Sequence, residues 1–173
     1  NKEHTELVKR DGMFLDSHGY VSPYFINKED KKACFEADKV AVICSATWEY
    51  EPKIINAVKL FYDQNPKQTP LVVFLERPHS DMTEKLVGIK GVGYNLCCVA
   101  TNGYDEKESE TLLTDIANLT GAVTYNPRNE TSSLEIGYAD KITVTLESTS
   151  IIVNEVPQIT SETLKVLEGQ DVK

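Results

Sequence analysis

The chain has 173 residues, of which 40% are hydrophobic, and its formal net charge is −9. That length suits one domain with a sizeable core, and no run of ~20 apolar residues is present that could cross a membrane. The acidic balance, with no basic cluster longer than Lys31-Lys32, argues against binding to nucleic acid or to an anionic membrane.

The four cysteines predict a reducing environment. Cys44, Cys97 and Cys98 lie inside apolar runs, Cys34 stands beside Phe35, and no Cys-x-x-Cys motif occurs. Such thiols are typical of small buried side chains in a cytosolic protein. A disulfide between Cys97 and Cys98 is the less favoured alternative.

The N-terminal third predicts strands. Residues 12–16 and 23–27 indicate short strands around a turn at Gly19. Residues 32–46 indicate two strands with a turn near Asp38, the second a continuous apolar run typical of a strand buried on both faces. The run GYVSPYFIN at 19–27 raises a question, because its apolar side chains suit either a core strand or a displayed surface.

The middle of the chain alternates between helix and strand. A helix is expected over 51–64, with Pro52 in its first turn and Asn65-Pro66 at its end. A second helix is expected from Ser80, as its N-cap, to about Ile89, stopping at Gly91 and Gly93. The strands expected on either side of that second helix cover 70–76 and 95–101.

The last third predicts one more helix and a hairpin. Residues 105–119 show an amphipathic pattern, and Gly121 is the candidate C-cap. The strands expected after it cover 122–125, 141–147 and 149–153, and a short helix is expected from Ser161. Strand–helix alternation flanked by hairpins predicts a mixed α/β domain.

No catalytic constellation is present in the sequence. The histidines, His4, His18 and His79, are scattered, so a zinc site is not indicated. The glycines of GIKGVG follow a helix rather than a strand, which favours a helix end over a dinucleotide loop. The acidic residues at 105–110 are explained by the preference of acids for helix N-termini.

The helix expected at 51–64 leaves two interpretations open. Ile54, Val58 and Phe61 form one apolar stripe, and Ile55 and Tyr62 lie on its flanks. The helix either packs on two sides or offers one apolar face to a partner.

Four stretches carry a pattern that periodicity does not explain. They are DGMFLDSHGYVSPYFIN (11–27), PLVVFLE (70–76), LLTDIANLTGA (112–122) and LEIGYADKITVTLESTSII (134–152). In order and spacing they resemble the apical domain of group I chaperonins, the GroEL family, over about residues 9 to 157.

The resemblance implies a fold and a function. The fold would be a swivelling β/β/α domain over residues 10–157, with mixed sheets and flanking helices, a connecting or disordered segment at 1–9, and a tail toward an intermediate domain at 158–173. The function would be the capture of non-native polypeptides in an apolar groove between two helices and a nearby loop. The co-chaperonin lid of the family would bind the same face.

The resemblance also assigns the chemistry to a larger protein. That protein would form a ring in the cytoplasm and hydrolyse ATP with Mg²⁺ in an equatorial domain. The motifs of that domain are absent from this chain. The chain itself is therefore expected to be no enzyme and to carry no cofactor.

The implied binding residues fall on three segments. In the loop they are Tyr20, Tyr24 and Phe25. In the first helix they are Val58 and Phe61, when the positions are counted back from Pro70 without gaps. An insertion of two residues at 65–70 would move them to Asn56 and Lys59, and the need for apolar surface favours the first register.

The second helix departs from the family pattern. Its implied positions are Thr83, Val87 and Gly88, and only Val87 keeps the apolar character, with Leu86 nearby. This departure weakens the implied binding of the lid more than that of substrate.

Two functions from other classes compete with this interpretation. A stand-alone interaction domain would keep the fold without refolding activity. A small-molecule enzyme would need a deep pocket with a perturbed titratable cluster.

Overall fold

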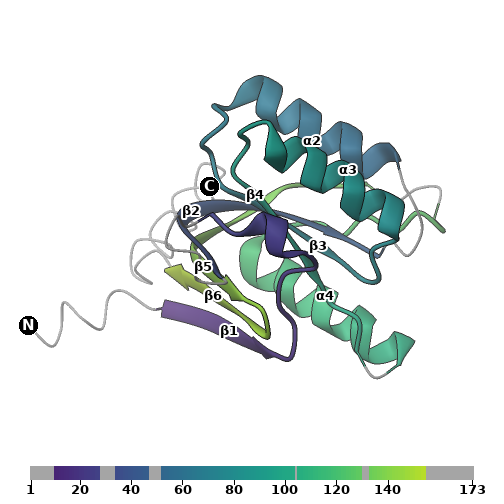
Figure 1. Cartoon of the computed structure of the whole chain (residues 1–173). Coiled ribbons are helices and arrows are strands. Elements are labelled where there is room, and N and C mark those ends of the chain that lie inside the picture. The colour runs from purple at the N-terminus through teal and green to yellow at the C-terminus, as the bar shows by residue number, and fades with distance from the viewer. Residues whose placement is uncertain (1–9, 28–33, 47–51, 104, 130–132, 155–173) are drawn as a thin grey trace, which may run out of the picture.

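A six-stranded mixed sheet forms the centre of the molecule, in the order β1-β6-β5-β2-β3-β4 (Figure 1). The computed structural model describes residues 10–27, 34–46, 52–103, 105–129 and 133–154, so the expectations for 1–9 and for a helix from Ser161 lie outside it. The strands are β1 (Arg10–Asp16), β2 (Cys34–Ser45), β3 (Leu71–Leu75), β4 (Leu96–Ala100), β5 (Gly137–Thr145) and β6 (Ser148–Asn154). β2, β3 and β4 run parallel, and the other neighbours pair antiparallel.

Helices cover both faces of the sheet. α2 (Pro52–Gln64) and α3 (Ser80–Gly91) lie side by side on one face, and α4 (Glu106–Thr120) lies on the other (Figure 1). Two successive β-α-β units place α2 and α3 on the same face, because such crossovers share one hand. The predicted α/β class and its three main helices are confirmed.

The helix ends follow capping chemistry. The Asp105 carboxylate accepts a hydrogen bond from the Glu108 backbone N–H (2.8 Å), and Gly121 ends α4 in the left-handed region at φ 79°. The expectation for Gly121 is confirmed. The expectation for Ser80 is wrong, because His79 is the N-cap of α3, with its Nδ1 accepting from the Asp81 N–H at 3.1 Å.

β2 is one strand rather than two. It pairs with β5 along its length, from Cys34 opposite Thr145 to Val42 opposite Gly137. The turn expected near Asp38 is replaced by a single distortion, with Lys39 at φ 58°. One residue in the left-handed region therefore bends the strand without ending it.

The segment after β1 connects the two ends of the sheet. The Tyr20 N–H donates to the Thr145 carbonyl (3.1 Å), and the Val21 N–H donates to the Cys98 carbonyl (3.0 Å). Gly19 is required there, since a Cβ would lie 2.2 Å from the backbone oxygens of Thr145 and Leu146. The segment therefore joins the hairpin strands to the outer edge of β4.

The strand expected at 23–27 is wrong. Pro23–Phe25 forms the 3-10 helix η1, in which the Ser22 hydroxyl accepts a hydrogen bond from the Tyr24 N–H at 3.3 Å. Ser22 and Pro23 are typical of a helical start, so local chemistry overrides the β propensity of the aromatic residues.

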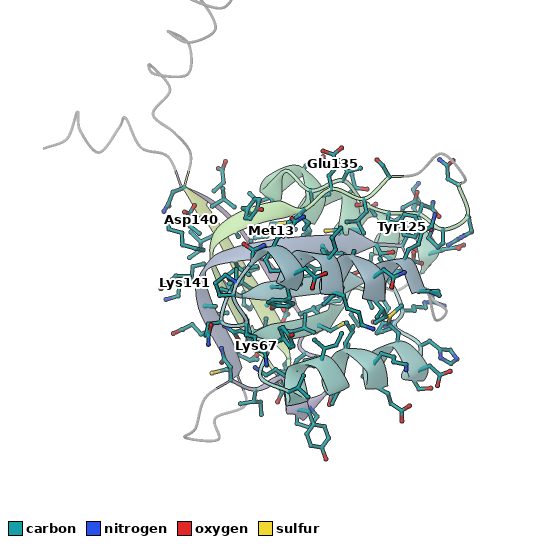
Figure 2. All side chains as sticks on the ribbon, turned by 90° about the horizontal axis from the view of Figure 1, so that it is seen from above. Met13, Lys67, Tyr125, Glu135, Asp140 and Lys141 are labelled. Atoms are coloured by element: carbon teal, nitrogen blue, oxygen red, sulfur yellow. The ribbon has the colours of Figure 1, made fainter. Side chains whose placement is uncertain are left out.

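The connection from α4 to β5 passes beside the carboxyl end of β2, where the Tyr125 N–H donates to the Cys44 carbonyl at 2.9 Å. Figure 2, which looks down on α2 and α3, shows Tyr125 and Asp140 on opposite sides of the molecule. The strand expected at 122–125 is reduced to single bridges, Ser45 with Tyr125 and Val123 with Glu135.

Candidate functional site

The paired helices α2 and α3 form the face that the resemblance identifies. The inward side of α2 is buried and consists of Ile54, Ile55, Val58, Phe61 and Tyr62. Its outward side exposes Asn56, Lys59 and Leu60, with Leu60 58% exposed.

The expectation that Val58 and Phe61 are displayed is wrong. Val58 is 0% exposed and Phe61 is 4% exposed, because both belong to the apolar stripe that packs on the sheet. Asn56 and Lys59, the positions of the alternative register, are both exposed to solvent. On this face the chain therefore presents polar side chains where the first register required apolar ones.

α3 shows the same division between core and surface. Leu86 is fully buried together with Met82, so it is not displayed either. Thr83 and Val87 are half-buried, which leaves part of each side chain accessible, and Gly88 is exposed. Of the α3 positions expected in binding, Thr83, Val87 and Gly88 keep accessible surface, and Leu86 does not.

The aromatic residues of the loop also divide between the core and the surface. Tyr20 is 8% exposed and Phe25 is 0% exposed, so both serve the core, whereas Tyr24 is 73% exposed. η1 packs against α3 and β4, which places Tyr24 beside the second helix. The run at 19–27 is therefore mostly core, with one aromatic ring displayed.

Sequence reasoning missed one displayed residue on α2. Leu60 stands outside the stripe of Ile54, Val58 and Phe61 on α2. The signal that could have found it is its helical position, since Leu60 lies one turn from Asn56, on the side away from the stripe.

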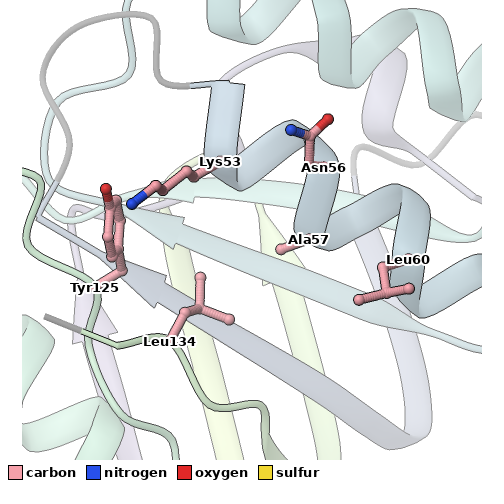
Figure 3. A pocket seen from close by; sticks show the side chains of 6 residues that line it. All are labelled: Lys53, Asn56, Ala57, Leu60, Tyr125 and Leu134. Carbon is pink, nitrogen blue, oxygen red and sulfur yellow. The ribbon is translucent and has the colours of Figure 1, made fainter.

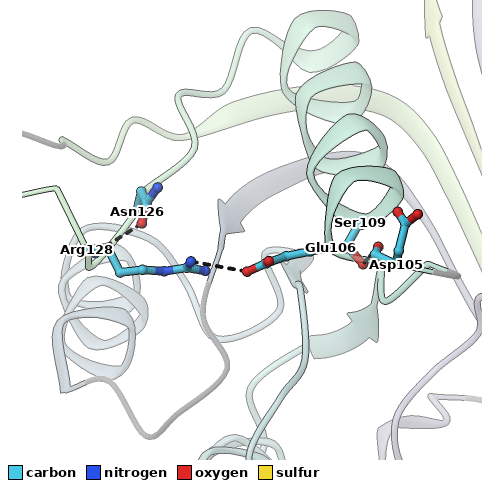
Figure 4. Close-up of polar contacts among 5 residues, drawn as sticks. All are labelled: Asp105, Glu106, Ser109, Asn126 and Arg128. Atoms are coloured by element: carbon cyan, nitrogen blue, oxygen red, sulfur yellow. Dashed lines mark hydrogen bonds and ion pairs between the residues drawn. The ribbon is translucent and has the colours of Figure 1, made fainter.

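A polar group at the carboxyl ends of the parallel strands is the strongest alternative site. Glu76 follows β3 and is buried, and burial raises its carboxyl pKa, while the nearby Arg128 acts in the opposite direction. Arg128 also forms an ion pair with Glu106, with 3.3 Å between Nη1 and Oε1 (Figure 4).

The other members of this polar group support the start of α4. The Ser109 hydroxyl donates to the Asp105 carbonyl (3.2 Å) and accepts from the Gly103 N–H (2.6 Å). These bonds cap the helix, so helix capping accounts for the positions of Asp105 and Ser109. Across the described part of the chain, no three His, Cys, Asp or Glu side chains gather so that they could hold a metal ion.

The thiols are placed for packing rather than for chemistry. Cys44, Cys97 and Cys98 are fully buried, as predicted, and Cys34 is half-buried. Burial raises the pKa of the Cys44 thiol to about 12, which keeps it protonated at neutral pH.

Known proteins with similar sequences are chaperonins. "Chaperonin CPN60-1, mitochondrial" of Cucurbita maxima is 32% identical over 156 residues, which are 85% of this chain and 26% of the relative. "RuBisCO large subunit-binding protein subunit alpha" of Ricinus communis is 30% identical over 157 residues, which are 87% of this chain and 30% of the relative. The chain is similar to one segment of the GroEL/Hsp60 chaperonins. No protein-family model matches it.

A chaperonin also shares the fold. The crystal structure of gp146 from the bacteriophage EL 2 (Pseudomonas aeruginosa), solved in the presence of ATP-BeFx, matches with a TM-score of 0.60 at 13% identity. The match covers 94% of this chain and 32% of that chaperonin chain. The resemblance to chaperonins and the predicted fold class are thus confirmed, and the chain spans about a quarter to a third of the length of the chaperonins it matches.

In the described ranges of the chain, no helix is long and apolar enough to cross a membrane.

Proposed function

We propose that the chain is the polypeptide-binding apical domain of an ATP-dependent chaperonin. The observation that carries the proposal is the row of neighbouring elements η1, α3 and α2, which occupies the segments that the chaperonin resemblance assigns to binding. The name of one relative, a binding protein for the large subunit of RuBisCO, is consistent with protein substrates.

The contact residues in this proposal are the accessible ones. Tyr24 offers an exposed ring, and Thr83 and Val87 offer partly exposed side chains on the neighbouring helix. Lys59 is the exposed residue on the α2 side of the same face. The buried residues Tyr20, Phe25, Val58, Phe61 and Leu86 hold these elements in place.

A face of this kind binds polypeptides weakly and with little preference for their sequence. At about 25 cal/mol per Å², burial of ~100 Å² of apolar surface contributes roughly 2.5 kcal/mol, before the entropy cost of association. One domain therefore binds weakly, and several copies in a ring capture a chain through multivalency. The full-length protein would supply the ring, the ATP and Mg²⁺ site and the domain motion that releases substrate.

The partners and compartment of the full-length protein belong to the same proposal. The substrates are non-native polypeptides, and a co-chaperonin lid would share the face. We expect the protein to act in the cytoplasm, in keeping with its buried free thiols.

Fluorescence anisotropy of a labelled, uncharged amphipathic peptide tests the proposal. Tyr24→Ser and Val87→Ser should each weaken binding about fivefold, which corresponds to about 1 kcal/mol. Tyr138→Ser is the matched control, since Tyr138 is 62% exposed and lies on β5, which is not one of the three elements of this face. Equal losses in all three variants would contradict the proposed face.

The same titration separates the competing functions. A stand-alone interaction domain would bind one specific partner and leave the amphipathic peptide unbound. The enzyme alternative has less support, because Asp105 caps α4 and Glu106 forms an ion pair with Arg128, which accounts for both carboxylates without a reaction.

A further inference from the structure

The loops at the amino ends of β3 and β4 surround a polar depression. Its volume is about 300 Å³, which is close to the size at which pockets for small ligands begin. Its described lining comes from the segment after η1, the loop after α2, and the last turn of α3 with the loop that follows it. The lining residues are Asn27, Gln68, Lys90, Gly93, Tyr94 and Asn95.

Hydrogen bonds hold the two main loops of the depression together. The Asn95 N–H donates to the Lys67 carbonyl (2.8 Å), and the Asn95 side-chain amide donates to the Gln68 carbonyl (3.3 Å). The Tyr62 hydroxyl lies within hydrogen-bond distance of the carbonyls of Thr69 and Asn95. These bonds join the loop after α2 to the loop after α3. The depression is therefore formed before a ligand enters, which lowers the entropy cost of binding.

The hydrogen-bonding groups of the depression leave an excess of donors. The Gln68 carbonyl already accepts from the Asn95 side chain, and the Asn95 carbonyl accepts from the Leu71 N–H (3.0 Å). The side chains of Gln68, Lys90 and Tyr94 can all donate, and none of them forms a hydrogen bond within the described part of the chain. Free donors beside occupied acceptors suit a ligand that only accepts hydrogen bonds, as an ionised oxyanion does.

The charge around the depression is positive. Among the described residues that line it, none is acidic. Lys90 is half-buried, and its ammonium has no carboxylate partner in the described ranges. A second ammonium, that of Lys67, lies 4.9 Å from the centre of the Tyr94 ring (Figure 2). The sequence that follows Asn27, at 28–32, contains three lysines and two acidic residues and so adds no net negative charge.

Burial gives Lys90 a reason to bind an anion. The pKa of its ammonium is lowered, because a partly buried charge loses hydration. A negative charge placed beside the ammonium replaces the lost hydration and stabilises the charged form.

The carboxyl end of α3 is the part of the depression that opposes an anion, because it is the negative end of the helix dipole. Its last carbonyls are already occupied. The Lys67 ammonium donates to the Val92 carbonyl (3.1 Å). The Val92 N–H donates to the Ile89 carbonyl (3.2 Å), and the Gly93 N–H donates to the Lys90 carbonyl (3.0 Å). The charge of the Lys90 side chain therefore stays available for a ligand.

The larger depression between α2 and the α4–β5 connection differs in this respect (Figure 3). Its volume is 390 Å³, and Lys53 is the charged residue among its described lining residues. The Lys53 ammonium lies over the Tyr125 ring, with 5.4 Å between the nitrogen and the ring centre. That charge is already engaged, so the larger depression indicates no ligand.

We propose that the depression at the amino ends of β3 and β4 binds a small oxyanion, a carboxylate or a phosphate group. Lys90 pairs with the charge of the anion, and the Gln68 amide and the Tyr94 hydroxyl donate hydrogen bonds to its oxygens. The Asn27 amide donates one hydrogen to the Glu36 carbonyl (3.3 Å), which leaves its second hydrogen for the anion. The site uses none of the residues proposed for contact with polypeptides.

Two-dimensional amide NMR with inorganic phosphate and acetate as separate probes tests the site. At constant ionic strength in chloride, phosphate should cause saturable shifts of the signals of Gln68, Gly93, Tyr94 and Asn95. Shifts with phosphate alone would identify a phosphate group as the ligand, and shifts with acetate would extend the site to carboxylates. Added salt should weaken binding, because it screens the charge of Lys90. The absence of saturable shifts with both probes would overturn the proposal.

Variants of the lining separate a specific site from general attraction to lysines. Lys90→Gln should weaken phosphate binding about fivefold, through the loss of a charge-assisted hydrogen bond. Gln68→Glu changes an exposed side chain without changing its size, and its negative charge should abolish binding. Lys85→Gln is the matched control, because Lys85 is an exposed lysine on α3 outside the depression. Equal weakening by Lys90→Gln and Lys85→Gln, or undiminished binding in Gln68→Glu, would overturn the proposal.

Discussion

The two halves of the sheet differ in how they are covered. In the parallel half, every residue of β3 is buried, and β2 is buried from Val40 to Ser45, because helices lie over both faces. In the hairpin half, buried and accessible residues alternate along β5 and β6. The proposed binding helices therefore lie on the half of the sheet whose strands are buried on both faces.

Exposed apolar residues have a different meaning in each half. Phe14 and Tyr138 are 67% and 62% exposed on β1 and β5, where one face of an antiparallel sheet can meet solvent. Tyr24 is equally exposed but stands beside α3, on the covered half. Exposure alone therefore does not identify a binding residue, and the neighbouring elements decide.

A pair of phenylalanines gives the sharpest test of this comparison. Phe74→Ala, in the middle of β3, removes a fully buried ring and should cost ~3–5 kcal/mol of unfolding free energy. Phe14→Ala removes a ring that is mostly in water and should change stability by less than about 0.5 kcal/mol. Urea unfolding of both variants measures the difference, and similar costs would show that the two halves are equally packed.

The connection between the halves should be the next most sensitive place. Gly19→Ala forces a Cβ to within 2.2 Å of two backbone oxygens, and such overpacking should cost ~2 kcal/mol. Gly88→Ala is the matched control on α3, where nothing lies within 4 Å of the added Cβ. That variant should gain about 0.5–1 kcal/mol, because alanine favours a helix over glycine. A Gly19→Ala variant as stable as the parent chain would mean that the connection is not tightly packed.

One hydroxyl links α2 to the loops of the parallel half. The Tyr62 hydroxyl lies within hydrogen-bond distance of the carbonyls of Thr69 (2.9 Å) and Asn95 (3.0 Å). Tyr62→Phe keeps the ring and should cost about 1 kcal/mol, measured by thermal and urea unfolding. Tyr138→Phe should have no effect, since Tyr138 is mostly exposed, and an equal loss in the two variants would exclude the hydrogen bonds as the cause.

Sequence patterns predicted most of the fold and misplaced part of the site. The parallel strands and the three helices follow from apolar runs, capping residues and glycines, which act locally. The misses at 23–27 and near Asp38 also have local causes, namely the start of η1 at Ser22 and the left-handed Lys39.

The wrong expectation that Val58 and Phe61 are displayed has another cause. Their spacing with Ile54 already matched a buried stripe, but the binding role argued for display. Whether an apolar stripe meets the core or a partner depends on the sheet beneath it, which a helical pattern does not contain. Tyr24 and Phe25 show the same limit, because two adjacent aromatic residues have opposite exposure.

The smallest predicted effect concerns Glu76, which is the one charged residue among the buried residues that the structure describes. Burial raises its folded-state pKa above the ordinary value of 4.5. Between those two pKa values the folded state binds a proton that the unfolded state has lost, so stability falls as the pH rises through this window. Below pH 4.5 the proton is bound in both states, and this contribution is fully present.

Glu76→Gln removes the titration, so the stability of this variant relative to the parent chain should increase between pH 4 and pH 7. Urea midpoints of both proteins at the two pH values measure the change, with Glu84→Gln on the exposed side of α3 as the control. A relative stability that stays constant with pH would mean that Arg128 and Arg77 offset the burial of the carboxylate, and the parallel half would then hold a charge without cost.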